Sequence, residues 1–151
     1  MYTQVRLFIK TGIAFLIVGL GLGSVLMVRR ELFGIWPDRR PVSAHTHALT
    51  VGFLMFLILG VALWLFPRAP KDDRRYSPGR IRACYWILVI GTAARVLAET
   101  VRATVESSAV SWIVVIASIG QAAGLLLYFW TMWSRIRPVG SHLREARGEE
   151  F

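Results

Sequence analysis

The chain has little from which to build a hydrolytic site. A single cysteine, Cys84, excludes a disulfide within the chain and a Cys-x-x-Cys motif. No nucleophile–base pair and no phosphate-binding loop is present, and acidic residues are scarce, with nine Asp and Glu against eighteen Lys and Arg. Nothing in this composition supports a hydrolase.

The chain is poor in charged residues and rich in long apolar runs. Hydrophobic residues make up 55% of the chain and charged residues only 18%, and the mean hydropathy is +0.52. Segments 7–28, 42–66, 83–104 and 109–133 are long enough to cross a bilayer, although three charged residues interrupt the third. We therefore predict an all-α, multi-pass membrane protein: a four-helix transmembrane domain over 1–137, followed by a short charged tail over 138–151.

The chain has a net charge of +9, and its Lys and Arg residues flank the apolar runs. This placement is typical of residues that orient a membrane protein, and it argues against a nucleic-acid partner. Twelve basic residues fall in the amino-terminal arm, the second loop and the tail, whereas five fall on the opposite side. This asymmetry predicts that both termini are cytoplasmic, in an inner (cytoplasmic) membrane. The first segment lacks a small-x-small cleavage site and is interpreted as a retained helix.

Small residues form stripes on three of the predicted helices. They are Gly12, Gly19 and Gly23 in the first, Gly91, Ala94 and Ala98 in the third, and Gly120 and Gly124 in the fourth. Such stripes let helix backbones approach closely. They also leave room for a flat cofactor, and they are compatible with a homo-oligomer that holds the cofactor at or near its interface.

Four side chains are expected at one depth, near the outer face. With cytoplasmic termini, His45 and His47 lie in the first turns of the second helix, Arg95 lies in the outer half of the third, and Met27 near the outer end of the first. Histidines two residues apart on a helix point about 200° apart, so one is expected to face the bundle interior and the other a neighbour, lipid headgroups or water.

Two interpretations of these residues stay open. Neutral imidazole ligates haem iron, and a cation such as Arg95 suits the haem propionates. Alternatively, both histidines sit in the interfacial layer and Arg95 pairs with Glu99 at i+4.

The remaining polar residues have simpler interpretations. Arg95, Glu99, Arg102 and Glu106 form an alternating-charge stripe, which a solvated outer extension of the third helix explains. In the fourth helix, Ser111, Ser118 and Gln121 are expected to form interhelical hydrogen bonds. His142 lies in the tail, where a surface role is expected.

One stretch resembles a known family. The segment SAHTHALTVGFLMFLILGVALWLFPR (43–68) resembles the second transmembrane helix of haem-copper oxidase subunit I and its nitric oxide reductase relatives. The opening His-x-His also resembles NnrS-type haem-containing membrane proteins, and WILVIGTAARVLAE (86–99) is weakly similar to a later helix of theirs. The resemblance implies that His47, or alternatively His45, ligates the iron of haem b. The sixth position would be Met27, a histidine of another subunit, or open to a gas.

The chain departs from that family in its other ligands. It lacks the second histidine for a low-spin haem and the three histidines of the copper centre, so a complete terminal oxidase is not expected and copper is the less favoured metal. The resemblance implies a haem protein for electron transfer or diatomic gas (NO or O₂) binding, with a quinone or respiratory partner. As an enzyme, it would be a haem-dependent oxidoreductase. The rival hypothesis is a non-catalytic accessory or assembly subunit of a respiratory complex.

Overall fold

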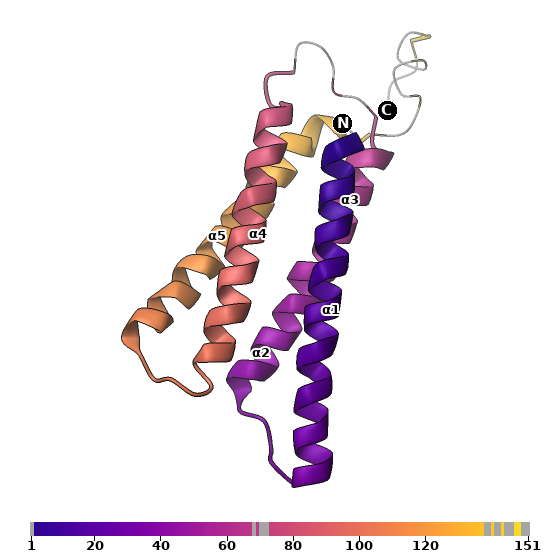
Figure 1. Ribbon diagram of the computed structural model, residues 1–151. Helices are drawn as coiled ribbons and strands as arrows, with labels where there is room; N and C mark the ends of the chain where they lie inside the picture. Colours follow the sequence, from indigo (N-terminus) through magenta and orange to yellow (C-terminus); the bar gives the residue numbers. More distant parts are fainter. Residues whose placement is uncertain are drawn as a thin grey trace.

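The computed structural model describes residues 2–67, 69, 73–137, 140, 143, 147 and 148, and this part of the chain is helical. Four antiparallel helical rods make up the molecule (Figure 1). They are α1 (Tyr2–Phe33), a second rod made of α2 (Arg39–His47), η1 (Ala48–Met55) and α3 (Phe56–Leu65), then α4 (Pro78–Val101) and α5 (Ser108–Met132), which continues as the short 3₁₀ segment η2 (Trp133–Arg135).

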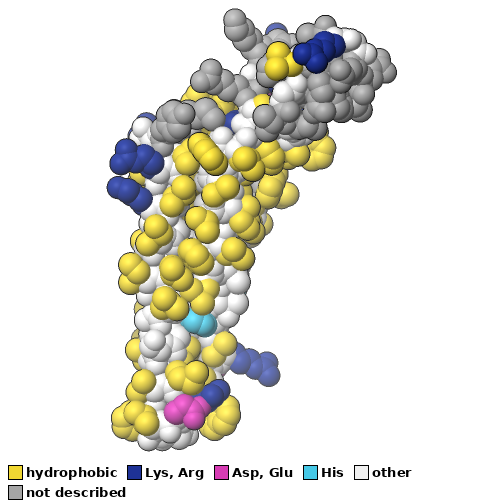
Figure 2. Space-filling view, turned by 90° about the vertical axis from the view of Figure 1, so that its right-hand side faces the viewer, with side chains coloured by type: hydrophobic (Ala, Val, Ile, Leu, Met, Phe, Trp, Pro, Cys, Tyr) yellow, Lys and Arg dark blue, Asp and Glu magenta, His cyan; other side chains and the backbone are white. Residues whose placement is uncertain are grey.

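The described residues form an all-α fold, as predicted, and all four rods are long and apolar enough to cross a membrane, as a multi-pass membrane protein requires. Figure 2 shows one face covered mainly by hydrophobic side chains, with charged side chains toward its two ends. Large apolar side chains on the outside of the bundle, such as Ile17 and Leu126, are 67% and 71% exposed. The predicted tail, 138–151, falls almost entirely outside the described residues.

The bundle has two distinct ends. The terminal end holds Tyr2 and Arg135, and the loop end holds the connections 34–38 and 102–107 (Figure 1). The loop-end helix α2 begins under an Asp38 cap, whose carboxylate accepts from the Arg39 N–H at 2.6 Å. At the terminal end, α4 begins at Pro78 under a Ser77 cap, so the third helix starts five residues before its predicted boundary.

The second rod is not a uniform α-helix. Its middle, Ala48–Met55, winds as a π-helix that begins at the residue after His47. The wider turn accommodates Phe15 of α1 at Gly52, where an added Cβ would lie 2.5 Å from the Phe15 Cγ atom. Hydropathy does not report helical pitch, so the sequence predicted one continuous helix at this place. π-Helical segments are rare in proteins, and those that occur often lie at functional sites.

The core lies in the terminal half, where α1, α3, α4 and α5 meet. Phe8, Phe56, Tyr85 and Tyr128 are buried there, and the Phe8 ring centroid lies 5.2–5.9 Å from the other three. The Tyr128 hydroxyl donates to the Leu59 carbonyl at 2.6 Å and thereby ties α5 to α3.

A fully buried cation closes the terminal end. The Arg135 guanidinium donates to the carbonyl oxygens of Leu63, Phe66 and Pro67 at 3.0, 2.8 and 2.7 Å. It also lies over the Tyr76 ring, 4.9 Å from the centroid. The Leu63 carbonyl lies in the last turn of α3, and the Phe66 and Pro67 carbonyls follow that helix. Arg135 therefore provides hydrogen bonds where α3 ends and complements the helix dipole.

The loop before α4 is joined to the same end. Asp73 accepts hydrogen bonds from the Ser134 hydroxyl and from the Arg75 N–H. These two hydrogen bonds hold the pKa of the Asp73 carboxyl below its usual value.

The stripes of small residues serve mainly in helix packing. An added Cβ at Gly91 would lie 3.1 Å from the Ala117 carbonyl, and one at Gly124 would lie 2.9 Å from Leu88. Gly12, Gly19 and Gly23 likewise approach the second rod. Gly120 is different, because nothing lies within 4 Å of an added Cβ there.

Gly91 and Gly120 therefore provide a matched test of the α4–α5 packing. We expect Gly91→Leu to separate the two helices, because the new side chain meets backbone, and to destabilise the protein by about 1–3 kcal/mol. Gly120→Leu points into open space and should leave stability unchanged or slightly raised, since leucine favours the helix. Thermal unfolding in detergent measures both, and equal effects at the two positions would contradict this packing.

Candidate functional site

The two histidines near the end of α2 face different neighbours. The His45 ring turns toward α1, where its Nδ1 lies 2.8 Å from the Gly19 carbonyl oxygen. Gly23 makes room for this ring, because an added Cβ would lie 2.6 Å from the His45 Cε1 atom. His45 therefore packs within the bundle, wedged against the α1 backbone.

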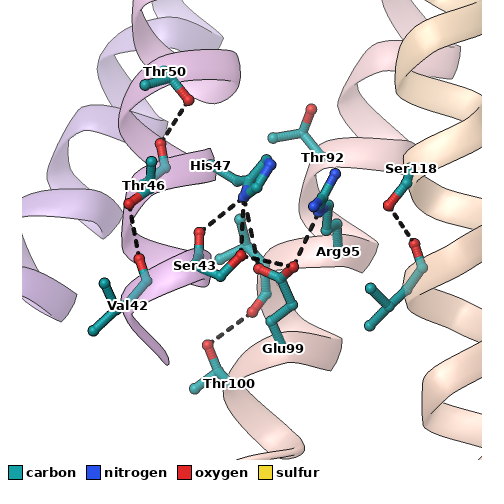
Figure 3. Close-up of polar contacts among 12 residues, drawn as sticks. Val42, Ser43, Thr46, His47, Thr50, Thr92, Arg95, Glu99, Thr100 and Ser118 are labelled. Carbon is teal, nitrogen blue, oxygen red and sulfur yellow. Dashed lines mark hydrogen bonds and ion pairs between the residues drawn. The ribbon is translucent and has the colours of Figure 1, made fainter. Parts of the chain in front are cut away.

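His47 turns toward α4 (Figure 3). Its Nδ1 lies 2.9 Å from the Ser43 carbonyl oxygen, 3.3 Å from the Ser43 hydroxyl and 3.8 Å from the Glu99 Oε2 atom. The His47 side chain is 22% exposed. The expected divergence of the two rings is thus found, and both rings contact neighbouring helices.

These contacts define the tautomer of each ring. A backbone carbonyl oxygen accepts hydrogen bonds and cannot donate them, so Nδ1 carries the proton in both His45 and His47. In the neutral ring, Nε2 then keeps its lone pair. Metal-ligating histidines have this arrangement, with one nitrogen on the metal and the other donating to a carbonyl or carboxylate.

A polar network joins α2 to α4 beside His47 (Figure 3). Gln121 extends this network to α5. Glu99 Oε1 accepts from the Arg95 Nε at 3.1 Å and from the Ser43 hydroxyl at 3.0 Å. Arg95 Nη1 donates to the Gln121 Oε1 at 3.2 Å, and the Gln121 amide donates to the Thr92 hydroxyl at 3.0 Å. The network connects helices from both halves of the chain.

Glu99 is the unusual member of this network. It is only 7% exposed, and its Oε2 atom is buried without a hydrogen-bond partner. The i+4 pair with Arg95 is confirmed, but the prediction of a solvated helix extension is wrong for Glu99. The charge stripe also does not continue as one helical face, because α4 ends at Val101, before Glu106.

Other predicted site residues lie apart. Met27 is 55% exposed and its sulfur accepts from Arg30 at 3.8 Å, and no hydrogen bond or ion pair of the described residues joins it to His45, His47 or Arg95. His142 falls outside the described residues. Gln121 forms the expected interhelical bonds, whereas the Ser111 and Ser118 hydroxyls donate within α5, to Ser107 and Val114, so the interhelical prediction is wrong for both.

The contacts of Ser43 and Thr92 and the burial of Glu99 were not predicted from the sequence. Ser43 precedes His47 by four residues, the spacing at which side chains share one face of a helix, and this could have indicated their contact. Thr92 and Glu99 flank Arg95 at i−3 and i+4, so the same rule places them on its face. Their burial against α2 and α5 depends on tertiary packing, which spacing does not report.

The described cavities do not border the histidines. An apolar groove of about 410 Å³ runs between α4 and α5, lined by Trp86, Ile87, Ile90, Gly91, Ala94, Ile113, Ile116, Ala117 and Gly120. Within the described part of the chain, no group of three or more His, Cys, Asp or Glu side chains could hold a bare metal ion.

Comparison with known proteins gives no assignment: no family model matches the chain, and no curated protein or solved structure is significantly similar to it.

Proposed function

We propose that this protein is a membrane-embedded b-type haem protein, related to oxidase and nitric oxide reductase subunit I, in which His47 ligates the iron. It would act in electron transfer, with a quinone or respiratory partner, or in binding a diatomic gas. The observation that carries the proposal is the Nδ1 contact of each α2 histidine with a backbone carbonyl, at 2.8 and 2.9 Å, which leaves Nε2 with a lone pair. The resemblance of residues 43–68 to a haem-binding helix supports it.

His47 is the better ligand of the two. The His45 ring is wedged against the α1 backbone at Gly19 and Gly23, so its role in helix packing is already evident. His47 is partly exposed and lies next to a carboxylate, as ligating histidines commonly do. Arg95 stays a proposed partner of the propionates through its remaining Nη2, since Nε and Nη1 are engaged by Glu99 and Gln121.

The donor set fits a haem iron, but one chain supplies only part of a pocket. The groove between α4 and α5 lacks a histidine, and neither α2 histidine borders it. A second copy of the chain or a partner subunit would supply the other wall and a sixth ligand, or would leave that position open to NO or O₂. When bound, haem supplies one-electron redox chemistry and a coordination site for a gas.

The proposed setting is the inner membrane, with both termini in the cytoplasm. Twelve basic residues belong to the terminal end, its loop and the tail, against five at the loop end. In this orientation His47 and Glu99 lie nearer the outer face. If catalytic, the protein would be a haem-dependent oxidoreductase.

The visible spectrum of the purified protein tests the proposal. We expect protein purified in detergent from haem-replete cells to show a Soret band and, after dithionite reduction, the α-band of a haem b. The pyridine haemochrome measures the haem type and its ratio to protein. A colourless preparation would contradict the proposal.

A second candidate is an accessory or assembly subunit of a respiratory complex. The groove between α4 and α5 favours this candidate, because its small residues Gly91, Ala94 and Gly120 would let a helix of another protein pack closely there. A Cβ added at Gly120 would have no atom within 4 Å. A colourless but well-folded protein would support this candidate over the haem protein.

A further inference from the structure

We propose that the protein binds an anionic phospholipid at the terminal end of the bundle, with the phosphate on Arg82 and one acyl chain in the groove between α4 and α5. Two cavities carry this inference, one with polar and apolar walls and one apolar, and Trp86 lines both of them. Haem takes no part in this site.

The first cavity lies where α1 and α4 begin, at the terminal end (Figure 1). It has a volume of about 380 Å³ and is lined by Thr3, Gln4, Leu7, Tyr76, Pro78, Arg82 and Trp86. Among the described residues, this lining contains one cation and no acidic side chain. The amino-terminal end of α4, which carries the positive end of the helix dipole, begins at Pro78 in the same wall. The charges around the cavity therefore favour an anion.

Three hydrogen-bond donors of this cavity are unused within the described part of the chain. The side chain of Arg82 forms no ion pair or hydrogen bond there, and the hydroxyls of Thr3 and Tyr76 form no hydrogen bond. Arg80 differs, because it donates to the carbonyls of Arg74 and Arg75 and lies over the Trp130 ring. The charged oxygens of a phosphate accept hydrogen bonds and cannot donate them, so they match a guanidinium with two hydroxyls beside it.

Trp86 indicates the depth of the site in the membrane. Tryptophan favours the level of the lipid headgroups, and Trp86 is 49% exposed on the outside of the bundle. Arg82 lies one turn closer to the start of α4, which is about 6 Å along the helix axis. The guanidinium is thereby placed at the level of the phosphates, with apolar surface on its membrane side.

That apolar surface is the groove between α4 and α5. Arg82, Trp86, Ile90 and Ala94 follow one another at four-residue spacing and form one stripe of α4, and the last three line the groove. From Arg82 to Ala94 the stripe is about 18 Å long. Half of a bilayer measures about 15 Å of hydrocarbon, or about 20–22 Å with its headgroups. The stripe therefore has the length of one lipid leaflet, whereas a transmembrane helix or a second copy of the chain would need a contact surface about 30 Å long.

Arg82→Gln tests the headgroup part of the site. We expect full-length protein in a nonionic detergent to bind phosphatidylglycerol more tightly than phosphatidylcholine, because the choline ammonium neutralises its phosphate. Arg82→Gln should weaken the binding of phosphatidylglycerol about tenfold, since a charge-assisted hydrogen bond is lost, and should largely abolish the preference between the two lipids. Native mass spectrometry of the protein titrated with each lipid measures the bound fraction.

Arg6→Gln is the matched control. It removes the same charge from an exposed side chain in the first turns of α1 that lines neither cavity, so the affinity for phosphatidylglycerol should stay at the wild-type value. If Arg82→Gln and Arg6→Gln bind phosphatidylglycerol equally well, the inference is overturned. Inorganic phosphate in excess should leave the lipid bound, because the acyl chain contributes to the affinity. Displacement of the lipid by inorganic phosphate would indicate a site for the free anion and would also overturn the inference.

Gly120→Leu tests the acyl-chain part of the site. An added Cβ at Gly120 has no atom within 4 Å, so the leucine extends into the groove without disturbing the helix packing. We expect the affinities for both lipids to fall by a similar factor, with the preference for phosphatidylglycerol kept. A lipid-free wild-type dimer that Gly120→Leu dissociates would assign the groove to a second copy of the chain and overturn the lipid site.

Discussion

Replacing His47 with alanine should remove nearly all of the Soret absorbance of the purified protein. The substitution deletes the nitrogen that we assign to the iron, and loss of even an outer-shell partner lowers metal affinity by about 10–100-fold. We therefore expect the haem-to-protein ratio, measured as pyridine haemochrome, to fall at least about tenfold. Far-ultraviolet circular dichroism should be unchanged, because the His47 ring contacts Ser43 and Glu99 near the surface of α2 and not the core.

His45→Ala is the control for this substitution. It removes an identical ring from the same turn of the helix, but that ring packs against Gly19 and Gly23. We expect a small loss of thermal stability with the haem content largely kept. The reverse outcome, in which His45→Ala loses the Soret band and His47→Ala keeps it, would identify His45 as the iron ligand. Restoration of the band in His47→Gly by added imidazole would show that the lost group acts as a ligand.

The membrane architecture could be predicted because hydrophobicity along the chain determines it. A run of apolar residues that spans the bilayer must satisfy its backbone internally, and helices do this within one segment. For most helix ends, the predicted boundary and the boundary in the structure therefore differ by only a few residues. Hydrophobicity does not indicate whether a helix winds as an α-helix or a π-helix, so the π-helix after His47 was not predicted.

Charged residues show where prediction from sequence stops. Arg135 was one of the twelve basic residues assigned to the cytoplasmic side, and Glu99 was assigned to a solvated face, because unpaired charge normally belongs in water. Both are buried, since tertiary packing gives each of them partners from distant segments: three carbonyls at the end of α3 for Arg135, and Ser43 of α2 for Glu99. Such partners cannot be read from local spacing.

The divergence of the two histidine rings was therefore predicted, whereas the residues that surround them were missed. The spacing of His45 and His47 indicated that the rings diverge, and the structure places them against α1 and α4. Their identical Nδ1 contacts depend on carbonyls of Gly19 and Ser43, which side-chain patterns do not reveal. The structure thus adds the Nδ1–H tautomer of both rings, on which the proposed function depends, and the buried carboxylate of Glu99.

Arg135→Gln should strongly destabilise the protein. The change leaves up to three carbonyl oxygens at the end of α3 without their donor in a fully buried position, and each buried unsatisfied group costs about 1–3 kcal/mol. Glutamine can replace one of these hydrogen bonds and cannot keep the contact with the Tyr76 ring. We expect the free energy of unfolding to fall by about 2–5 kcal/mol.

Arg82→Gln is the matched control for Arg135→Gln, because it removes the same charge from an exposed side chain near the same end of the bundle. Its effect should stay within about 0.5 kcal/mol. The loss of unfolding free energy for Arg135→Lys should lie between those of the other two variants. An ammonium keeps the charge but lacks the planar set of donors that reaches three carbonyls. Unfolding followed by tryptophan fluorescence in one detergent measures all three. If Arg135→Gln unfolds together with Arg82→Gln, the buried guanidinium does not hold α5 to the end of α3, and the aromatic core and the Tyr128–Leu59 bond must carry that end of the bundle.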